Sequence, residues 1–289
     1  MALIRPSGKD GSNTMNKLII NLAPTGMIPT KEMTPHVPVS PEEIVADVLA
    51  CAKLGASMAH IHARDVEGVP TYRPELFRDI ISEIRRQNRE IILTATTSGR
   101  TYNEFEKRAA VLELAGDAKP DMASLTLSSV NFNKVASINS PDMIIALAEK
   151  MRDKGIKPEL EVFDLGMINF AHYLITKGLL TPPYYFNILL GNIAAAQAKL
   201  LHLGLLVSEL PPESIWAVTG IGDSQCRMNA IGIIAGDGVR VGLEDNIWFD
   251  EGRTKLATNV MLVERIVKMA ETLGRDIAKP AEVRQMLKL

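Results

Sequence analysis

The feature that most constrains the fold is a regular alternation of short apolar runs with longer amphipathic segments. A short apolar run bounded by turn residues is typical of a buried strand, whereas apolar residues at helical spacing are typical of a helix that packs on a sheet. Strands are expected at residues 17–23, 56–63, 90–97, 121–127, 159–163, 185–190, 215–219 and 238–243. Helices are expected from residue 41, over 74–89 and 103–115, from residue 141, over 167–177, 193–203, 230–234 and 254–273, and after residue 280.

This order of elements predicts a (β/α)8 TIM barrel, because strand and helix alternate eight times and no linker rich in Pro, Gly or Ser divides them. The alternative is a doubly wound parallel sheet with an extra lobe. Such a sheet usually carries Gly-x-Gly-x-x-Gly after its first strand, and this chain has Ala23-Pro24-Thr25-Gly26-Met27 there. We therefore expect one catalytic barrel domain over residues 17–289, preceded by a disordered polar leader at residues 1–16.

The composition gives no indication of a nucleic-acid or membrane partner. The chain has 289 residues, 23% of them charged, and a formal net charge of −2, without the basic excess that nucleic acids and anionic membranes attract. Its apolar runs fall short of the roughly 18 residues that span a bilayer. Two cysteines and no signal-like N-terminus indicate the reducing cytoplasm. A small-molecule partner is expected.

The clearest candidates for chemistry are His60 and His62, where the second predicted strand meets a loop. Side chains alternate along a strand, so the two imidazoles project from the same face. They could share a metal ion, or they could be a satisfied pair of polar residues at a strand end. TIM barrels gather their chemistry at the C-terminal ends of the strands, so the side chains at the other strand ends decide between these interpretations.

The other strand ends carry many polar side chains, namely Asn21, Thr25, Thr96, Thr97, Ser98, Ser124, Thr126, Glu161, Asp164, Arg240, Glu244 and Asp245. The hydroxyls among them could equally cap the following helices. In a closed barrel the eighth strand lies beside the first, so Glu244 can reach a metal ion held by His60 and His62. Two imidazoles, one carboxylate and an open position are the usual ligands of a catalytic zinc ion. Asp245 could then act as a general base, with its charged form stabilised by Arg240.

A series of further motifs runs in order along the chain. They are Thr25-Gly26, Ser40-Pro41-Glu42-Glu43, His60-Ile61-His62-Ala63-Arg64-Asp65, Lys107-Arg108, Pro120-Asp121-Met122-Ala123-Ser124, Val130-Asn131-Phe132, Pro158-Glu159-Leu160-Glu161, Gly166-Met167, Trp216 to Gly222, and Gly242-Leu243-Glu244-Asp245-Asn246. In these motifs the chain resembles the β-keto acid cleavage enzymes, whose founding member is 3-keto-5-aminohexanoate cleavage enzyme. The resemblance extends over nearly the whole chain, from about Lys17.

The resemblance implies a zinc-dependent TIM barrel that converts a β-keto acid and acetyl-CoA into acetoacetate and a new acyl-CoA. It implies a Claisen and retro-Claisen mechanism without an enzyme nucleophile, and a homo-oligomer that we expect to be a tetramer. It assigns the metal ligands to His60, His62 and Glu244, and the base to Asp245 with support from Arg240 and Glu161. It assigns substrate contacts to the hydroxyls of Thr96 and Ser124, and Thr97, Asn21 and Ile28 are further candidates for the substrate site.

Two positions depart from the family pattern. Ile28 stands where the founding member has a carboxylate that holds the substrate ammonium group. Because an apolar side chain cannot compensate a buried ammonium ion, we expect a neutral or apolar β-keto acid as substrate. Asp223 stands where the family often has Arg, which removes an anion contact at that position, and Arg227 could replace it.

Two other functions are compatible with a His-x-His strand in a barrel. An amidohydrolase-type zinc hydrolase shares this motif but needs further histidines at strand ends, whereas His172 and His202 lie in helical runs and His36 lies in a loop. A ligand-binding barrel without turnover would keep the metal and lose the base, so the presence of Asp245 and Arg240 argues against it. The sequence leaves open which β-keto acid is used and which residues bind CoA.

Overall fold

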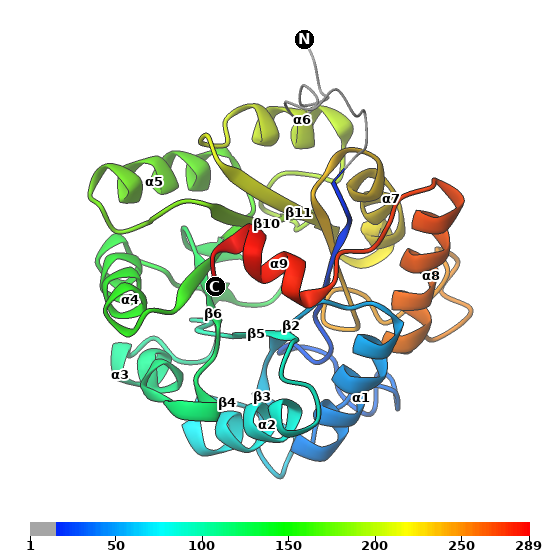
Figure 1. Ribbon diagram of the computed structural model, residues 1–289, viewed down its shortest axis with the longest axis horizontal. Coiled ribbons are helices and arrows are strands. Elements are labelled where there is room, and N and C mark those ends of the chain that lie inside the picture. Colours follow the sequence, from blue (N-terminus) through cyan, green and yellow to red (C-terminus); the bar gives the residue numbers. More distant parts are fainter. Residues whose placement is uncertain (1–15) are drawn as a thin grey trace.

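Eight parallel strands close into a barrel in the computed structural model, which describes residues 16–289 (Figure 1). The leader expected at residues 1–16 thus falls outside the described residues, apart from its last one. The barrel strands, in spatial order, are β1 (Ile19–Leu22), β12 (Gly238–Val241), β11 (Ser214–Gly220), β10 (Tyr184–Leu190), β9 (Lys157–Val162), β6 (Met122–Thr126), β5 (Ile92–Ala95) and β2 (Met58–Ile61). The predicted (β/α)8 TIM barrel is confirmed.

Helices surround the barrel on its outside (Figure 1). They are α1 (Pro41–Leu54), α2 (Pro74–Gln87), α3 (Phe105–Ala109), α4 (Pro141–Lys154), α5 (Leu165–Thr176), α6 (Leu200–Ser208), α7 (Gln225–Ala235) and α8 (Asn259–Thr272). The expected start signals operate at α1 and α4, where Ser40 and Ser140 accept hydrogen bonds from the backbone of the first turn and Pro41 and Pro141 follow them. No helix among residues 16–289 is both long and apolar enough to cross a membrane.

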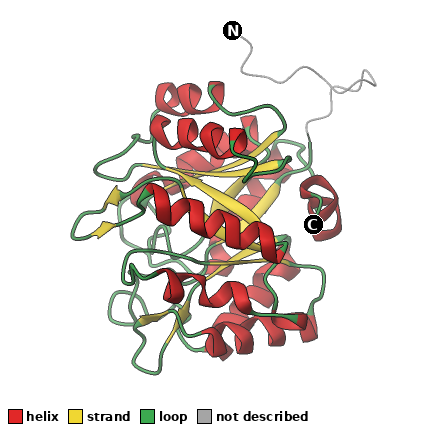
Figure 2. Cartoon of the chain, turned by 90° about the vertical axis from the view of Figure 1, so that its left-hand side faces the viewer, coloured by secondary structure: helices red, strands yellow, loops and turns green. Residues whose placement is uncertain are grey.

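One end of the barrel is closed by the C-terminal helix α9 (Pro280–Leu287), which lies across the middle of the view in Figure 1. Its Val283 and Leu287 pack with Ile19, Met58 and other residues that begin the barrel strands. Figure 2 shows short two-stranded hairpins at the opposite end, formed by β3 (Ala63–Arg64) with β4 (Pro70–Thr71) and by β7 (Val130–Asn131) with β8 (Ala136–Ser137). The C-terminal ends of the strands are therefore the end at which a site can open.

The inside of the barrel changes from apolar to polar along the strands. Outward-facing residues such as Ile20 and Leu22 join the large core beneath the helices. Inward-facing residues beyond the apolar layer at α9 are polar and almost fully buried, and they include Asn21, His60, Thr94, Ser124, Glu159, Asn187 and Arg240. Because buried polar groups need partners, this layer must be held together by hydrogen bonds and ion pairs.

The helix predicted over residues 193–203 is wrong in its first half. Residues 193–199 form turns, and α6 begins only at Leu200. The alanines favour a helix, but the backbone finds other partners, because the Ala196 amide donates to the Phe163 carbonyl and the Gln197 side chain donates to the carbonyls of Asn192 and Ala195. The last long helix also begins later than expected, at Asn259 after its cap Thr258, and β2 ends at Ile61.

Candidate metal centre and its surroundings

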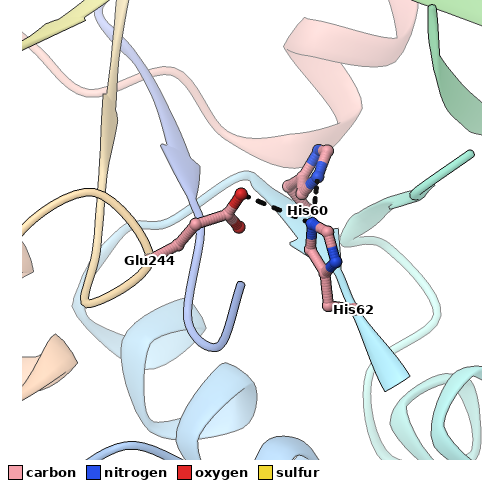
Figure 3. A group of neighbouring side chains, drawn as sticks. All are labelled: His60, His62 and Glu244. Atoms are coloured by element: carbon pink, nitrogen blue, oxygen red, sulfur yellow. Dashed lines mark hydrogen bonds and ion pairs between the residues drawn. The ribbon is translucent and has the colours of Figure 1, made fainter. Parts of the chain in front are cut away.

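The side chains of His60, His62 and Glu244 meet at the open end of the barrel, where they point toward one another (Figure 3). His60 Nε2 lies 3.2 Å from His62 Nε2, and His62 Nε2 lies 3.4 Å from Glu244 Oε1. One potential ligand atom from each of the three residues lies within 4.8 Å of the other two. The structure thus brings together the three residues that the sequence analysis assigned to one metal ion.

This arrangement fits a divalent metal ion. Two ligand atoms of a tetrahedral zinc ion, each about 2.0–2.1 Å from it, lie roughly 3.3 Å apart, close to both distances found between these side chains. Glu244 Oε2 is buried and has no hydrogen-bond partner among residues 16–289. A buried carboxylate oxygen without a partner is costly, and a metal ion would satisfy it. Three protein ligands would leave a further position for substrate.

The charges of Glu244 and His62 suit metal binding, whereas His60 must lose a proton to become a ligand. Burial alone would raise the pKa of Glu244, but the Arg240 guanidinium holds it well below the usual value, so the carboxylate is ionised. Burial lowers the pKa of His62 and favours its neutral form. Burial also acts to lower the pKa of His60, but the carboxylates of Glu159 and Glu244 raise it to about 9.

Two glycines allow the first and last strands to bring Glu244 into place. A Cβ atom on Gly26, whose φ is +63°, would lie 2.4 Å from Glu244 Cγ. A Cβ atom on Gly242 would lie 2.0 Å from the Ala23 carbonyl oxygen. The Glu244 amide donates to that same carbonyl at 3.2 Å. Only glycine permits this close approach, so the turn after β12 depends on both positions.

Arg240 connects the candidate metal ligand Glu244 to two further carboxylates. Its Nε and Nη2 donate to both oxygens of Asp245, at 2.9 and 3.1 Å. Its Nη2 also lies 2.7 Å from Glu244 Oε1, and its Nη1 lies 3.5 Å from Glu161 Oε1. Burial raises the pKa of Asp245 despite the opposing effect of Arg240, and burial likewise raises the pKa of Glu161. The structure brings together Asp245, Arg240 and Glu161, and their catalytic roles stay predictions.

The predicted substrate hydroxyls lie just after β5, at Thr96 and Thr97, and within β6, at Ser124. Thr97 and Ser124 pair with each other, since the Thr97 hydroxyl donates to the Ser124 carbonyl at 2.6 Å and the Thr97 amide donates to the Ser124 hydroxyl at 3.1 Å. The Thr96 hydroxyl accepts from the Ser98 amide at 3.2 Å. Thr96 and Thr97 also line a cavity of about 30 Å³ together with His62 and Met27. That volume holds little more than one water molecule, so the cavity is a narrow slot beside the candidate metal centre.

Ile28 and Asn21, the other candidates for the substrate site, do not lie with the threonine and serine hydroxyls. Ile28 is 52% exposed in the loop between β1 and α1. Asn21 is fully buried, and its amide donates to Glu159 Oε1 at 2.6 Å and lies 3.3 Å from the Tyr185 hydroxyl. The structure therefore gives Asn21 partners within the barrel, and a contact of Asn21 with substrate stays a prediction.

Asp223, the charged departure from the family pattern, and Arg227, its possible replacement, lie in exposed ion pairs. Asp223 accepts two hydrogen bonds from Arg253 at 3.0 Å, and Arg227 lies 3.1 Å from Glu251. Arg227 is thus already paired with a carboxylate, which weakens the idea that it replaces the missing family arginine.

Three residues around the site were not identified from the sequence. Glu159 lies beneath His60, with its Oε2 2.6 Å from His60 Nδ1. Arg64 donates to the carbonyls of Gly26 and Pro29 at 2.8 and 2.9 Å and so holds the loop that carries Ile28. Arg100 stacks on the Phe132 ring, with its guanidinium carbon 3.6 Å from the ring centre. Glu159 could have been identified from the Glu-x-Glu spacing on its strand, because this spacing places Glu159 and Glu161 on the same face of the strand.

Comparisons with known proteins agree with this geometry. A family model described as beta-keto acid cleavage enzyme matches residues 17–289. A 3-keto-5-aminohexanoate cleavage enzyme from Fusobacterium nucleatum subsp. nucleatum is 38% identical over 276 residues, which are 95% of this chain and 99% of that protein. A 3-oxoadipate:acetyl-CoA acetyltransferase from Cupriavidus necator is 33% identical over 274 residues, which are 94% of each chain. The solved apo structure of ObcA is similar in fold, with a TM-score of 0.78 and 21% identity over 88% of this chain and 66% of that one.

Proposed function

This chain belongs to the beta-keto acid cleavage enzyme family, and from that premise we propose that it converts a β-keto acid and acetyl-CoA into acetoacetate and a new acyl-CoA. The observation that carries the proposal is the meeting of His60, His62 and Glu244 beside Asp245, which Arg240 holds through two hydrogen bonds. A metal-binding group and a positioned carboxylate can supply the carbonyl polarisation and the proton transfer that carbon–carbon bond exchange at a keto acid uses. Related proteins named as acetyl-CoA transferases of keto acids support the same reaction.

We propose that His60, His62 and Glu244 hold a zinc ion. When bound, zinc would supply a Lewis acid that polarises the keto carbonyl and makes the C2 proton of the β-keto acid easier to remove. Asp245 is the base that takes this proton. Its raised pKa brings it nearer to neutral pH, and the two hydrogen bonds from Arg240 fix the direction of its carboxylate. Proton abstraction by a positioned base is typically worth about 10²- to 10⁴-fold in rate.

The carbon–carbon exchange then follows without an enzyme nucleophile. The C2 carbanion attacks the acetyl thioester carbonyl and expels the CoA thiolate, which attacks the original keto carbon. Cleavage of the bond between that carbon and C2 gives the new acyl-CoA, and the released carbanion takes up a proton to become acetoacetate. Asp245, which received the first proton, is placed to return it. Thr96 and Ser124 are proposed to contact the substrate beside this base.

Arg100 lies near enough to the site carboxylates for Glu244, Glu161 and Asp245 to oppose the lowering of its pKa by burial. Its Nε is buried without a hydrogen-bond partner among residues 16–289, and no carboxylate of that part of the chain pairs with it. The other buried or half-buried arginines there all contact carboxylates or carbonyls, as Arg64, Arg85, Arg108, Arg240, Arg265, Arg275 and Arg284 do. We propose that Arg100 receives a carboxylate or phosphate oxygen of one of the two substrates.

The substrate side chain is proposed to be neutral or apolar, because Ile28 offers no charge to an ammonium group. The proposal requires that bound substrate covers Ile28, which is 52% exposed on a backbone that Arg64 holds on both sides. We also propose a homotetramer. Support comes from α6, whose Leu200 and Leu201 are 66% and 71% exposed, because exposed apolar patches of this kind commonly mark subunit contacts.

The hydrolase alternative finds no support in the positions of the other histidines. His172 lies 2.9 Å from the Glu209 carbonyl, and His202 accepts a hydrogen bond from the Gln197 amide at 2.9 Å. His36 is exposed in the loop between β1 and α1. None of the three belongs to the group around His60, so an amidohydrolase-type ligand set is not formed by residues 16–289.

The test is to incubate the purified protein with zinc, acetyl-CoA and a panel of neutral, cationic and dicarboxylic β-keto acids. We expect acetoacetate and a matching new acyl-CoA in equal amounts, measured by mass spectrometry. The Asp245→Asn variant is the control for uncatalysed exchange. Hydrolysis of an amide or lactone without CoA, and no exchange with any keto acid, would contradict the proposal.

A further inference from the structure

A buried carboxylate beneath the candidate metal centre has no place in the reaction above. Glu159 is fully buried on β9, one layer deeper in the barrel than Glu161. Its Oε2 lies 2.6 Å from Nδ1 of His60, which is the ring nitrogen that faces away from His62. An ionised carboxylate only accepts hydrogen bonds, so His60 Nδ1–H is the donor in this pair.

The second oxygen of Glu159 is held from other strands. Asn21 on β1 donates to Glu159 Oε1 at 2.6 Å, and the amide of Asn187 on β10 lies 3.5 Å from the same oxygen. The Asn21 amide also lies 3.3 Å from the hydroxyl of Tyr185. Both oxygens are therefore fixed, and the carboxylate cannot turn away from His60 without breaking hydrogen bonds that have no solvent to replace them.

His60, Glu159 and Glu161 form a second group that could bind a metal by proximity alone. The distance between His60 Nδ1 and Glu159 Oε2 argues against that use. Ligand atoms of one tetrahedral zinc ion lie roughly 3.3 Å apart, whereas these two atoms lie 2.6 Å apart, as in a short charge-assisted hydrogen bond. Glu159 is thus placed to orient a ligand and not to be one.

We propose that Glu159 is a positioning residue, which fixes His60 with Nδ1–H turned into the barrel and Nε2 turned toward His62 and Glu244, and that Asn21 holds Glu159 in place. The inference rests on the proposed function only in assuming that His60 binds a divalent ion. A carboxylate that accepts from the far nitrogen of a histidine fixes the ring and its tautomer, and makes the near nitrogen a stronger ligand. Loss of such a partner typically weakens metal binding by about 10- to 100-fold.

The experiment compares zinc affinity, by competition with a coloured chelator, for the full-length protein and for Glu159→Gln. The new amide oxygen can still accept from His60, but it lacks the negative charge that makes Nε2 of His60 a stronger ligand. We expect zinc to bind about 10- to 100-fold more weakly. We also expect a changed visible spectrum when cobalt replaces zinc, because the geometry at His60 differs.

The Glu159→Gln variant is compared with a milder variant and with a matched control. Asn21→Ala removes the support but keeps Glu159, and should weaken zinc binding by a smaller factor, which keeps the test available if Glu159→Gln does not fold. Asp121→Asn makes the same change from carboxylate to amide in an ion pair with Arg284, and should lower thermal stability without changing zinc affinity. Folded Glu159→Gln and Asn21→Ala with wild-type zinc affinity and cobalt spectrum would overturn this inference alone. A wild-type protein that binds no divalent ion would contradict the proposed function as well.

Discussion

At the scale of single residues, two neighbouring carboxylates share Arg240, but only one of them also faces the histidines, and we propose different roles for them. Glu244 points to the imidazoles of His60 and His62, whereas Asp245 accepts both its hydrogen bonds from Arg240. Both residues lie in the turn after β12, and this turn leaves Glu244 beside the imidazoles and Asp245 on Arg240. The sequence predicted that Glu244 reaches the two histidines and that Asp245 points elsewhere, and the role of Asp245 as the base stays a prediction.

Variants of the two carboxylates should separate metal binding from turnover. Glu244→Gln removes a charged ligand and should lose bound zinc, measured by metal analysis after gel filtration. Asp245→Asn should keep zinc, because Asp245 is not a ligand, and should lower turnover by about 10²- to 10⁴-fold, because an amide cannot take a proton. Near wild-type turnover in Asp245→Asn would show that another group is the base.

Arg100 gives a second prediction at this scale. Because its guanidinium is stacked on Phe132 and makes no hydrogen bond among residues 16–289, Arg100→Gln should leave stability nearly unchanged and raise KM about tenfold or more for one substrate. Separate KM measurements for the keto acid and acetyl-CoA identify which one. Arg78→Gln, at an exposed position, is the control. If the KM values for both substrates are unchanged, Arg100 does not bind either of them.

At the scale of elements, loops held by arginines and asparagines place the site residues. The loop between β1 and α1 is fixed by Arg64, which binds the carbonyls of Gly26 and Pro29. The segment after β12 is fixed by Asn259, which accepts from the Leu243 amide at 2.8 Å and donates to the Pro24 carbonyl at 3.0 Å. These contacts join segments far apart in the sequence, so a single sequence without contact information could not reveal them.

The loop that carries Ile28 should set the preference for the substrate side chain. Ile28→Glu introduces a carboxylate where the family's founding member has one, and should increase kcat/KM for an amino-keto acid relative to a neutral keto acid. Ile28→Gln has nearly the same size without the charge and is the control. The same substrate preference in both variants and in the wild type would show that this loop does not contact the substrate side chain.

A carboxylate that joins α1 to α8 should make stability depend on pH. Burial raises the pKa of Asp47 to about 6, above its ordinary value of 3.8, despite the hydrogen bond from Asn259. The folded chain therefore holds this proton more tightly than the unfolded chain, so protonation stabilises the fold below about pH 6 and this stabilisation is lost as pH rises from about 4 to 6.

Removal of this charge should flatten the pH dependence. Asp47→Asn keeps an acceptor for Asn259 but cannot titrate. When the pH rises from 5 to 7.5, the free energy of unfolding of the variant should therefore increase by about 1 kcal/mol relative to that of the wild type. Urea unfolding at both pH values measures the difference. Glu42→Gln on the exposed face of α1 is the control. If the free energy of unfolding changes equally with pH in Asp47→Asn and in Glu42→Gln, Asp47 has an ordinary pKa in the folded chain.

At the scale of the whole molecule, the barrel was predictable because the strand–helix alternation fixes the topology, and the topology brings His60, His62 and Glu244 to one end. The alanine-rich segment before α6 was mispredicted, since a hydrogen bond to the distant Phe163 carbonyl and local bonds from the Gln197 side chain override helix propensity. Glu159 was missed because its partners lie on β1 and β2, and only the closed barrel shows which inward-facing side chains meet.

The measurement that tests the central claim most directly is anomalous X-ray scattering at the zinc edge, from crystals of this protein grown with zinc. We predict a peak about 2.0–2.2 Å from His60 Nε2, His62 Nε2 and an oxygen of Glu244, with Asp245 outside the ligand set. No peak among these three side chains, or a peak between His60, Glu159 and Glu161, would contradict the account.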